Sequence, residues 1–115
     1  MPQKICVVIP AYDEEKTIGN VLKPLSATRT IDEIIVVSDG SHDRTANIAR
    51  SYNARVIEFD ENHGKTNAVL TGVKNTDADI ILMLDADLIG LKEEHITSLL
   101  QPVIDNKADM TIGIF

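Results

Sequence analysis

The residues best suited to chemistry are two carboxylates separated by a single residue, Asp85-Ala86-Asp87. They follow directly on the apolar run at 80–84, so they begin where a buried strand is expected to end. Alternate residues of an extended segment face the same side, and two carboxylates held that way can share a divalent cation. Mg²⁺ typically takes one or two carboxylates together with phosphate oxygens and waters. A turn or a helix cap is the alternative interpretation of such a pair, and its position after the strand favours a metal site.

Acidic and polar segments also follow three other apolar runs, at 10–15, 38–43 and 60–65. In a parallel α/β sheet, ligands bind outside the carboxyl ends of the strands, so these segments and the Asp pair are expected to face one crevice. Like charges gathered there repel one another, and a cationic or donor-rich partner should offset them. Four such segments together indicate a ligand site rather than four unrelated turns.

Within these segments, two short motifs suggest specific contacts. Asp39-Gly40 forms a tight turn in which glycine permits a positive φ, and a carboxylate there can accept a hydrogen bond from the ring N–H of a base. Gly64-Lys65 opens a helix, where backbone N–H groups and an ammonium group can meet a phosphate. Of the three histidines, His63 alone is expected near the pocket, and no Ser/His/Asp or Cys/His nucleophile set is present.

These segments are held by alternating strand and helix patterns. Apolar runs, mostly β-branched, lie at 5–9, 34–37, 56–57 and 80–84, with a fifth candidate at 110–115. They do not alternate with polar residues, which is typical of strands buried on both faces of a parallel sheet. The sequence therefore predicts an α/β protein, a three-layer α/β/α fold with a mostly parallel, Rossmann-like sheet.

Helix patterns fill the intervals between the runs. The first places Ile18, Val21, Leu22 and Leu25 on one face, with Asp13 as its N-cap and an early end or kink at Pro24. The second runs from an Asp43 cap to Tyr52, and the third from Lys65 to Lys74. The fourth carries Ile96, Leu99, Leu100, Val103 and Ile104 on one face, and Pro102 is expected to bend it.

Composition limits the class of protein. The 115 residues suffice for one domain, 1–115, and 11 basic against 18 acidic residues give a net charge of −7. Without a basic cluster, the chain is a poor candidate for a duplex-binding surface. The single cysteine, Cys6, sits in an apolar run and suits a reducing compartment. Neither a signal peptide nor a membrane span is recognisable, so a cytoplasmic location is expected.

Four segments in this order resemble a known family: VVIPAYDEE at 7–15, IVVSDGSHDRT at 35–45, HGKTNA at 63–68 and LDADL at 84–88. The chain resembles the nucleotide-sugar-binding half of family 2 glycosyltransferases with the GT-A fold, of the dolichyl-phosphate mannose synthase and glucosyl-3-phosphoglycerate synthase type. The resemblance covers essentially the whole chain. One departure is Ser38, where many members carry a second Asp.

The resemblance implies a role for each matching residue. Pro10, Ala11 and Tyr12 would line the base and ribose pocket, Glu14 would lie near the ribose, and Asp39 would accept from the base. Lys65 would lie near the diphosphate, Asp85 toward the ribose or the metal, and Asp87 would bind the metal directly. The metal, Mg²⁺ or Mn²⁺, would neutralise the leaving nucleoside diphosphate. The implied partner is a UDP- or GDP-linked sugar, and neither the sugar nor the acceptor is specified.

Family catalytic regions are roughly twice this long, comparable to a large α/β domain. We therefore expect the acceptor site and the catalytic base to lie beyond Phe115, the chain to be a truncated or natural fragment that binds without transferring sugar, and its exposed apolar surface to favour self-association. A lipid-phosphate acceptor would place the full-length protein at the membrane surface.

Two alternatives remain open from the sequence. A response-regulator receiver domain has this length and binds Mg²⁺ through carboxylates at strand ends, but it needs an acidic pair directly after the first strand, where Pro10-Ala11-Tyr12 stands here. A non-catalytic nucleotide-binding module is the other. A dinucleotide-binding domain is disfavoured because no Gly-x-Gly-x-x-Gly follows the first strand.

Overall fold

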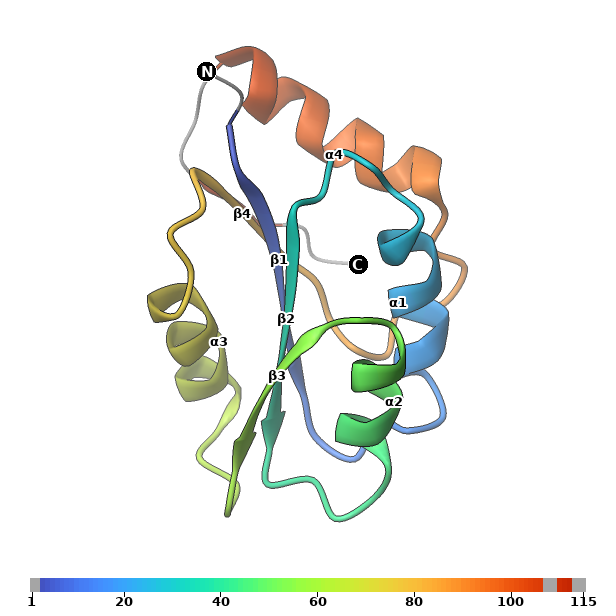
Figure 1. The fold of residues 1–115 in the computed structure, drawn as a ribbon, viewed down its shortest axis with the longest axis vertical. Helices are drawn as coiled ribbons and strands as arrows, with labels where there is room; N and C mark the ends of the chain where they lie inside the picture. Colours follow the sequence, from blue (N-terminus) through green and yellow to red (C-terminus); the bar gives the residue numbers. More distant parts are fainter. Residues whose placement is uncertain (1–2, 107–109, 113–115) are drawn as a thin grey trace.

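Strands and helices alternate along the chain in the computed structural model, which describes residues 3–106 and 110–112 (Figure 1). The elements are β1 (Ile5–Ala11), α1 (Ile18–Ser26), β2 (Glu33–Asp39), α2 (Thr45–Ser51), β3 (Arg55–Phe59), α3 (Lys65–Lys74), β4 (Ile80–Met83), α4 (Glu93–Asn106) and β5 (Met110–Ile112). The predicted order is confirmed. Of the fifth apolar run, 110–112 form a strand, and 113–115 lie outside the described residues.

The strands form one sheet in the order β3-β2-β1-β4-β5, and every pairing between them is parallel. The register places Val8 of β1 between Ile35 of β2 and Met83 of β4. The chain moves outward from β1 to β3 and then returns through α3 to β4, on the opposite side of β1. Between β1 and β4 the connections therefore leave in opposite directions, which opens a crevice at the carboxyl ends of these strands.

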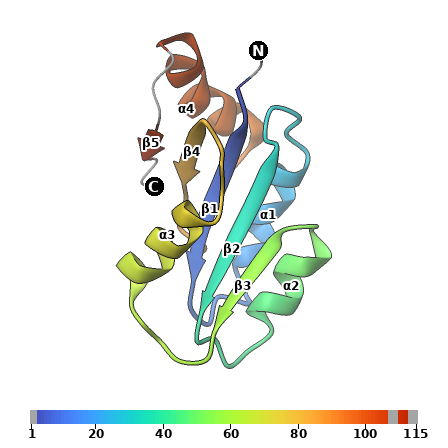
Figure 2. The same ribbon diagram turned by 60° about the vertical axis from the view of Figure 1, so that its left-hand side comes forward.

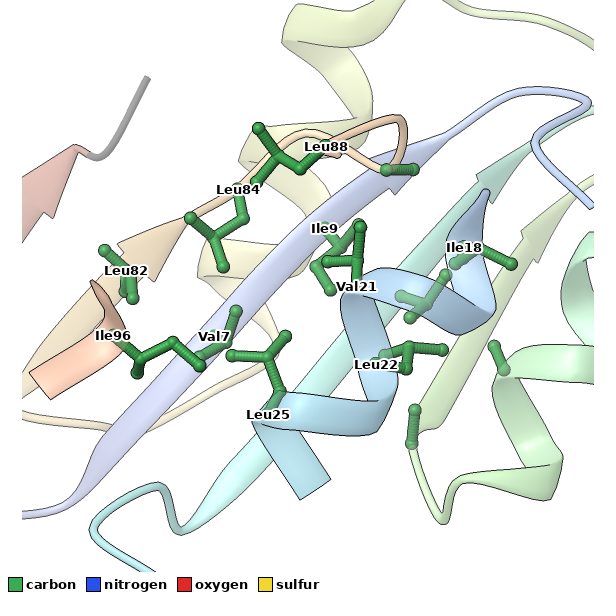
Figure 3. Packing of buried hydrophobic residues seen from close by; sticks show 14 of the residues in the cluster. Val7, Ile9, Ile18, Val21, Leu22, Leu25, Leu82, Leu84, Leu88 and Ile96 are labelled. Carbon is green, nitrogen blue, oxygen red and sulfur yellow. The ribbon is translucent and has the colours of Figure 1, made fainter. Parts of the chain in front are cut away.

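Helices cover both faces of the sheet, as Figures 1 and 2 show: α3 lies on one face, and α1, α2 and α4 lie on the other. The larger apolar cluster joins Val7, Ile9 and Leu82 of the strands to residues of α1, α2 and α4 (Figure 3). The smaller cluster packs Val8, Ile35 and Ala68 beneath α3. Strands β1, β2 and β4 are thus largely buried on both faces, which is the reason that their sequences do not alternate, whereas the residues of β3 are half-buried or exposed.

Helix α3 packs very closely on the sheet. Gly72 of α3 is buried, and a Cβ at this position would lie 2.5 Å from Cγ1 of Val8. Glycine is therefore required for the contact between this helix and β1. That contact holds α3 close against the sheet. The first turn of the helix, which begins at Lys65, lies at the carboxyl end of the sheet.

Two of the helices contain a proline. Helix α1 ends two residues after Pro24, as predicted. Helix α4 continues past Pro102 to Asn106 as one helix. None of the helices that the described residues form is long and apolar enough to cross a bilayer.

Candidate functional site

A pocket of about 310 Å³ opens at the carboxyl end of the sheet, at the crevice beside β1. It is lined by Pro10, Ala11, Tyr12, Glu14, Asp39, Asn62, Gly64, Lys65, Asp85, Ala86 and Asp87. The lining comes from the ends of β1 and β2, the segment that leads into α3, and the turn after β4. The structure thus brings all eight site residues predicted from the sequence into one pocket. Gly64 also lines the pocket, in agreement with the expected phosphate contact at the start of this helix, whereas the sequence assigned no role to Asn62 and Ala86.

The Asp pair occupies a turn and not the extended segment expected from the sequence. Strand β4 ends at Met83, and the backbone turns at Ala86 and Asp87. Ala86 is buried, and its carbonyl oxygen lies 2.9 Å from the hydroxyl of Thr17, which precedes α1. This contact holds the turn against the β1–α1 loop. Both carboxylates line the pocket as predicted, but they do so from a turn and not from an extended segment.

The cation expected to offset the acidic groups is Lys65. Its ammonium group lies 2.5 Å from Oδ1 of Asp85. Asp87 is exposed, and within the described residues its side chain makes no hydrogen bond or ion pair. The two carboxylates therefore differ: Asp85 is neutralised from within the chain, and Asp87 is open to a ligand.

Asp39, at the end of β2, holds the loop that leads into α3. The residue is only 3% exposed. Its Oδ1 accepts a hydrogen bond of 2.6 Å from the His63 N–H, and its Oδ2 accepts one of 3.0 Å from the Gly64 N–H. Carboxylate oxygens have two acceptor positions each, so one position on each oxygen remains. The predicted contact between Asp39 and a base requires these remaining positions.

Gly40 lets the loops after β2 and β3 approach each other. Its φ is +75°, and a Cβ there would lie 2.5 Å from the backbone nitrogen of Asn62 and 2.5 Å from the carbonyl carbon of Glu61. Backbone atoms cannot move aside as a flexible side chain can. Glycine is therefore needed for conformation and for space, and the Asp39-Gly40 motif shapes this wall of the pocket.

The predicted N-cap role of Asp13 is wrong. Helix α1 begins at Ile18 with Thr17 at its N-cap position, and its first turn contains no acidic residue. Asp13 lies in the preceding loop with φ +51°, and its Oδ1 accepts a 2.8 Å hydrogen bond from the His42 N–H. A hydrogen bond to the neighbouring loop replaces the local cap.

Asp43 does accept from the start of α2, as predicted, although Arg44 holds the N-cap position. Its Oδ1 accepts a 3.0 Å hydrogen bond from the Thr45 N–H. Burial by itself would raise the pKa of Asp43. Hydrogen bonds from the Thr45 hydroxyl and from the backbone N–H groups of Thr45 and Glu15 outweigh burial and hold this pKa below its usual value.

The prediction that His63 lies near the pocket holds for its backbone and not for its ring. The N–H group bonds to Asp39, whereas the exposed imidazole packs edge-on against Phe59, with ring centroids 5.3 Å apart. His95 lies elsewhere, where its Nδ1 accepts from the Lys92 N–H at the start of α4.

The chemistry of the donor set fits a hard divalent cation. The described residues contain no group of three or more His, Cys, Asp or Glu side chains that could enclose a metal. Two carboxylates, Asp85 and Asp87, do face the pocket. Mg²⁺ and similar ions are commonly held by one or two carboxylates, with phosphate oxygens and waters completing the shell. The residues therefore fit a metal bound together with a phosphate ligand.

Curated relatives are similar in sequence to this chain over part of their length. The chain is 42% identical over 99 residues to a 4,4'-diaponeurosporenoate glycosyltransferase of Staphylococcus haemolyticus, a match that covers 81% of this chain and 26% of the relative. The enzyme of the same name from Staphylococcus aureus is 34% identical over 101 residues, covering 84% and 27% respectively. The chain thus spans about a quarter of the length of the curated relatives it matches.

Solved structures match the fold at similar identity. Glucosyl-3-phosphoglycerate synthase from Mycobacterium tuberculosis superposes with a TM-score of 0.81 at 32% identity, covering 89% of this chain and 41% of that one. Its structures include complexes with Mn²⁺, UDP and glucosyl-3-phosphoglycerate, and with Mn²⁺ and UDP-glucose. A family model for glycosyl transferase family 2 matches residues 6–115. The fold, the pocket and these matches agree, and the chain belongs to glycosyl transferase family 2.

Proposed function

We propose that this chain forms the nucleotide-sugar site of a glycosyltransferase, which binds a nucleoside-diphosphate sugar with a divalent metal and passes the sugar to an acceptor. The observation that carries the proposal is the convergence of eight residues from four separate segments on one pocket at the crevice of the sheet. The UDP, UDP-glucose and Mn²⁺ bound to the Mycobacterium tuberculosis synthase support this class of ligand.

The base and ribose are assigned to the side of the pocket formed by β1 and β2. Pro10, Ala11 and Tyr12 form its wall, and Tyr12 is 45% exposed, so its ring is accessible to a ligand. Asp39 accepts from the base through the positions that its backbone contacts leave. Glu14 lies near the ribose, where a carboxylate can accept hydrogen bonds from hydroxyl groups.

The diphosphate and the metal are assigned to the other side. Lys65 stands at the first position of α3, where an ammonium group and the helix N-terminus both favour phosphate. Asp87 would hold the metal directly, and Asp85 would contact the ribose or the metal. When bound, Mg²⁺ or Mn²⁺ supplies positive charge that stabilises the departing nucleoside diphosphate.

We assign no catalytic base to the described residues, because the carboxylates of the pocket already have roles in binding. Transfer to an acceptor belongs to the proposal for the whole protein. The second candidate, a nucleotide-binding module without turnover, has the same pocket, and a turnover assay with a panel of acceptors separates the two. The receiver-domain alternative is excluded, because receiver sheets have the order 2-1-3-4-5 and this sheet has the order 3-2-1-4-5.

The test is nucleotide binding with and without metal. UDP, GDP and their sugars are titrated into the chain by calorimetry, and thermal unfolding is followed in parallel. A ligand that binds only the folded state at a hundredfold excess over its Kd raises stability by about 2.7 kcal/mol. We expect Mn²⁺ to strengthen binding of the diphosphate, and we expect Asp87→Ala to abolish this increase without changing the unfolding of the free chain.

Asp60→Ala is the matched control. Asp60 is also an exposed carboxylate just beyond a strand end, but it does not line the pocket. The Asp60 variant should keep the wild-type metal dependence. If Asp87→Ala keeps it too, Asp87 is not a metal ligand. If no nucleoside diphosphate binds the wild-type chain under any of these conditions, the proposed function is wrong.

A further inference from the structure

The β1–α1 loop, which carries Tyr12 and Glu14 into the pocket, is tied to the β2–α2 loop along its backbone. The N–H groups of Asp13, Glu14 and Glu15 each donate to a side chain in that loop or at the first residue of α2. Their acceptors are Ser41 Oγ at 3.0 Å, Thr45 Oγ1 at 2.9 Å and Asp43 Oδ2 at 3.2 Å. Three consecutive donors are therefore satisfied within the chain and are not available to a ligand.

The central tie, from Thr45 to Glu14, is the best protected. Thr45 is completely buried. Its hydroxyl donates its one proton to Oδ1 of Asp43, so the oxygen faces the Glu14 N–H as an acceptor. The Thr45 N–H donates to the same carboxylate oxygen at 3.0 Å. Asp43 thus fixes the orientation of the hydroxyl that fixes Glu14.

The side chain of Glu14 is held from the opposite direction. Its Oε2 lies 3.1 Å from the hydroxyl of Thr17, and the same hydroxyl lies 2.9 Å from the carbonyl oxygen of Ala86. A hydroxyl has one proton to donate, so Thr17 bonds to either partner in turn. The backbone of Glu14 is therefore bound to buried Thr45 at the start of α2. Its side chain contacts the Thr17 hydroxyl, which also contacts the turn that carries Asp85 and Asp87.

We propose that Asp43 and Thr45 are positioning residues of the ligand site, which act by fixing the backbone of Glu14 so that its carboxylate faces the pocket. Neither side chain lines the pocket. The proposal rests on the proposed function for the identity of the ligand, a nucleoside diphosphate. If these residues only cap α2, their loss lowers stability and leaves the contribution of Glu14 to binding unchanged.

The first test needs no ligand. Amide hydrogen exchange is measured at Glu14 in the wild-type chain, in Thr45→Val and in Thr45→Ser. Valine keeps the shape of threonine and removes the acceptor, whereas serine keeps the hydroxyl. We expect exchange at Glu14 to accelerate at least tenfold in Thr45→Val and to stay within about threefold of wild type in Thr45→Ser. Unchanged exchange in Thr45→Val would overturn the proposal.

The second test is a double-mutant cycle on UDP affinity, measured by calorimetry with Mn²⁺ at a temperature where every variant is folded. We expect Thr45→Val to weaken binding about fivefold to tenfold, and Thr45→Ser to restore it to within about twofold. In a Glu14→Ala background, Thr45→Val should change affinity by less than about twofold, because coupled residues are not additive. Full additivity of the two changes would overturn the positioning role.

Thr28→Val is the control for lost stability. The Thr28 hydroxyl also makes a local hydrogen bond, to the carbonyl oxygen of Pro24 at 2.8 Å, but it lies outside the pocket. It should not change UDP affinity. If the wild-type chain binds no nucleoside diphosphate, the proposed function fails, and the exchange result alone then decides whether Thr45 positions Glu14.

Discussion

The two ends of the sheet use the same kinds of residue for different purposes. At the amino end, the Lys4 ammonium lies 2.5 Å from Asp77, and at the carboxyl end the Lys65 ammonium lies 2.5 Å from Asp85. Lys4 also lies 3.8 Å from Glu33, and Lys65 lines a pocket with other carboxylates. What differs is how many of those carboxylates the chain itself satisfies.

At the amino end, the four carboxylates that the structure describes around Lys4 and the start of β1 all have a partner within the chain. Glu33 lies between Lys4 at 3.8 Å and Arg55 at 3.9 Å and also accepts from the Thr76 hydroxyl. Asp32 and Asp79 accept from the backbone N–H groups that open β1, those of Ile5 and Lys4. The hydrogen bond between Lys4 and Asp77 raises the pKa of Lys4 and lowers that of Asp77.

At the carboxyl end, the chain satisfies some of the carboxylates and leaves others open. Asp39 and Asp43 bind backbone N–H groups, whereas Asp87 has no partner among the described residues and faces the pocket. Charges satisfied internally join segments of the chain, and charges left open are available to a ligand. A pocket with open charge is therefore a more specific sign of function than acidic residues alone.

The largest effect is expected from adding a side chain at Gly40, where the loops after β2 and β3 approach each other. Gly40→Ala adds a Cβ 2.5 Å from the backbone of Asn62 and forces alanine to a φ of +75°. We expect the variant to lose about 3–5 kcal/mol of stability from strain and overpacking together. Chemical denaturation measures this loss, and UDP binding should weaken more than tenfold because Asn62 lines the pocket.

Gly90→Ala isolates the contribution of backbone strain. Gly90 has nearly the same φ, +74°, but a Cβ there meets nothing within 4 Å. This variant should lose only about 1–2 kcal/mol and should bind UDP as wild type does. Equal losses in the two variants would mean that the close approach of the loops at Gly40 has no energetic consequence.

The features that the sequence predicted are those set by local pattern. Unbroken apolar runs gave the strands, because burial on both faces leaves no place for polar residues. Asp39 and the Asp pair were identifiable because each stands directly after such a run. Strand ends of a parallel sheet meet at one edge, so the position along the chain was enough to bring these residues together.

The features that it did not predict depend on contacts between loops. Asp13 has the residue type of an N-cap and the right distance from an apolar helix face, yet it bonds to the N–H of His42, 29 residues away. Ala86 joined the pocket lining because Thr17 holds its carbonyl oxygen. No local pattern encodes either partner, since both pairs form only after the loops have been brought to one edge of the sheet.

The second-largest effect concerns Cys6 and tests whether water reaches the amino end of β1. Burial raises the pKa of the Cys6 thiol from 9.0 to about 11. The unfolded chain therefore loses this proton first as the pH rises. The contribution of Cys6 to stability should be constant well below pH 9 and should fall by about 2 kcal/mol between pH 9 and pH 11.

The measurement compares urea denaturation of the wild-type chain and Cys6→Ala across this range. The alanine variant is expected to lose stability by a constant amount through lost packing, but without the additional fall above pH 9. Parallel pH profiles would show that water reaches the thiol and that the amino end is more open than its paired charges indicate. UDP affinity should not differ between the two proteins at pH 7.

The smallest effect is expected when each of the two lysines is replaced and the UDP affinities of the two variants are compared. Both ion pairs join partly or fully exposed side chains, so neither contributes much to stability. Lys65, however, lines the pocket, and Lys4 does not. We expect Lys65→Met to weaken UDP binding in the presence of Mn²⁺ about fivefold, roughly 1 kcal/mol for a screened hydrogen bond between an ammonium group and a phosphate. Lys4→Met should leave that affinity unchanged.

The loss in Lys65→Met should shrink as the salt concentration rises from about 0.05 M to 0.5 M, because the lysine is well exposed to screening ions. Calorimetric titrations of both variants at the two salt concentrations provide the measurement. A loss that is equal in the two variants, or independent of salt, would show that the ammonium of Lys65 does not contact the diphosphate and that its ion pair serves the same purpose as that of Lys4.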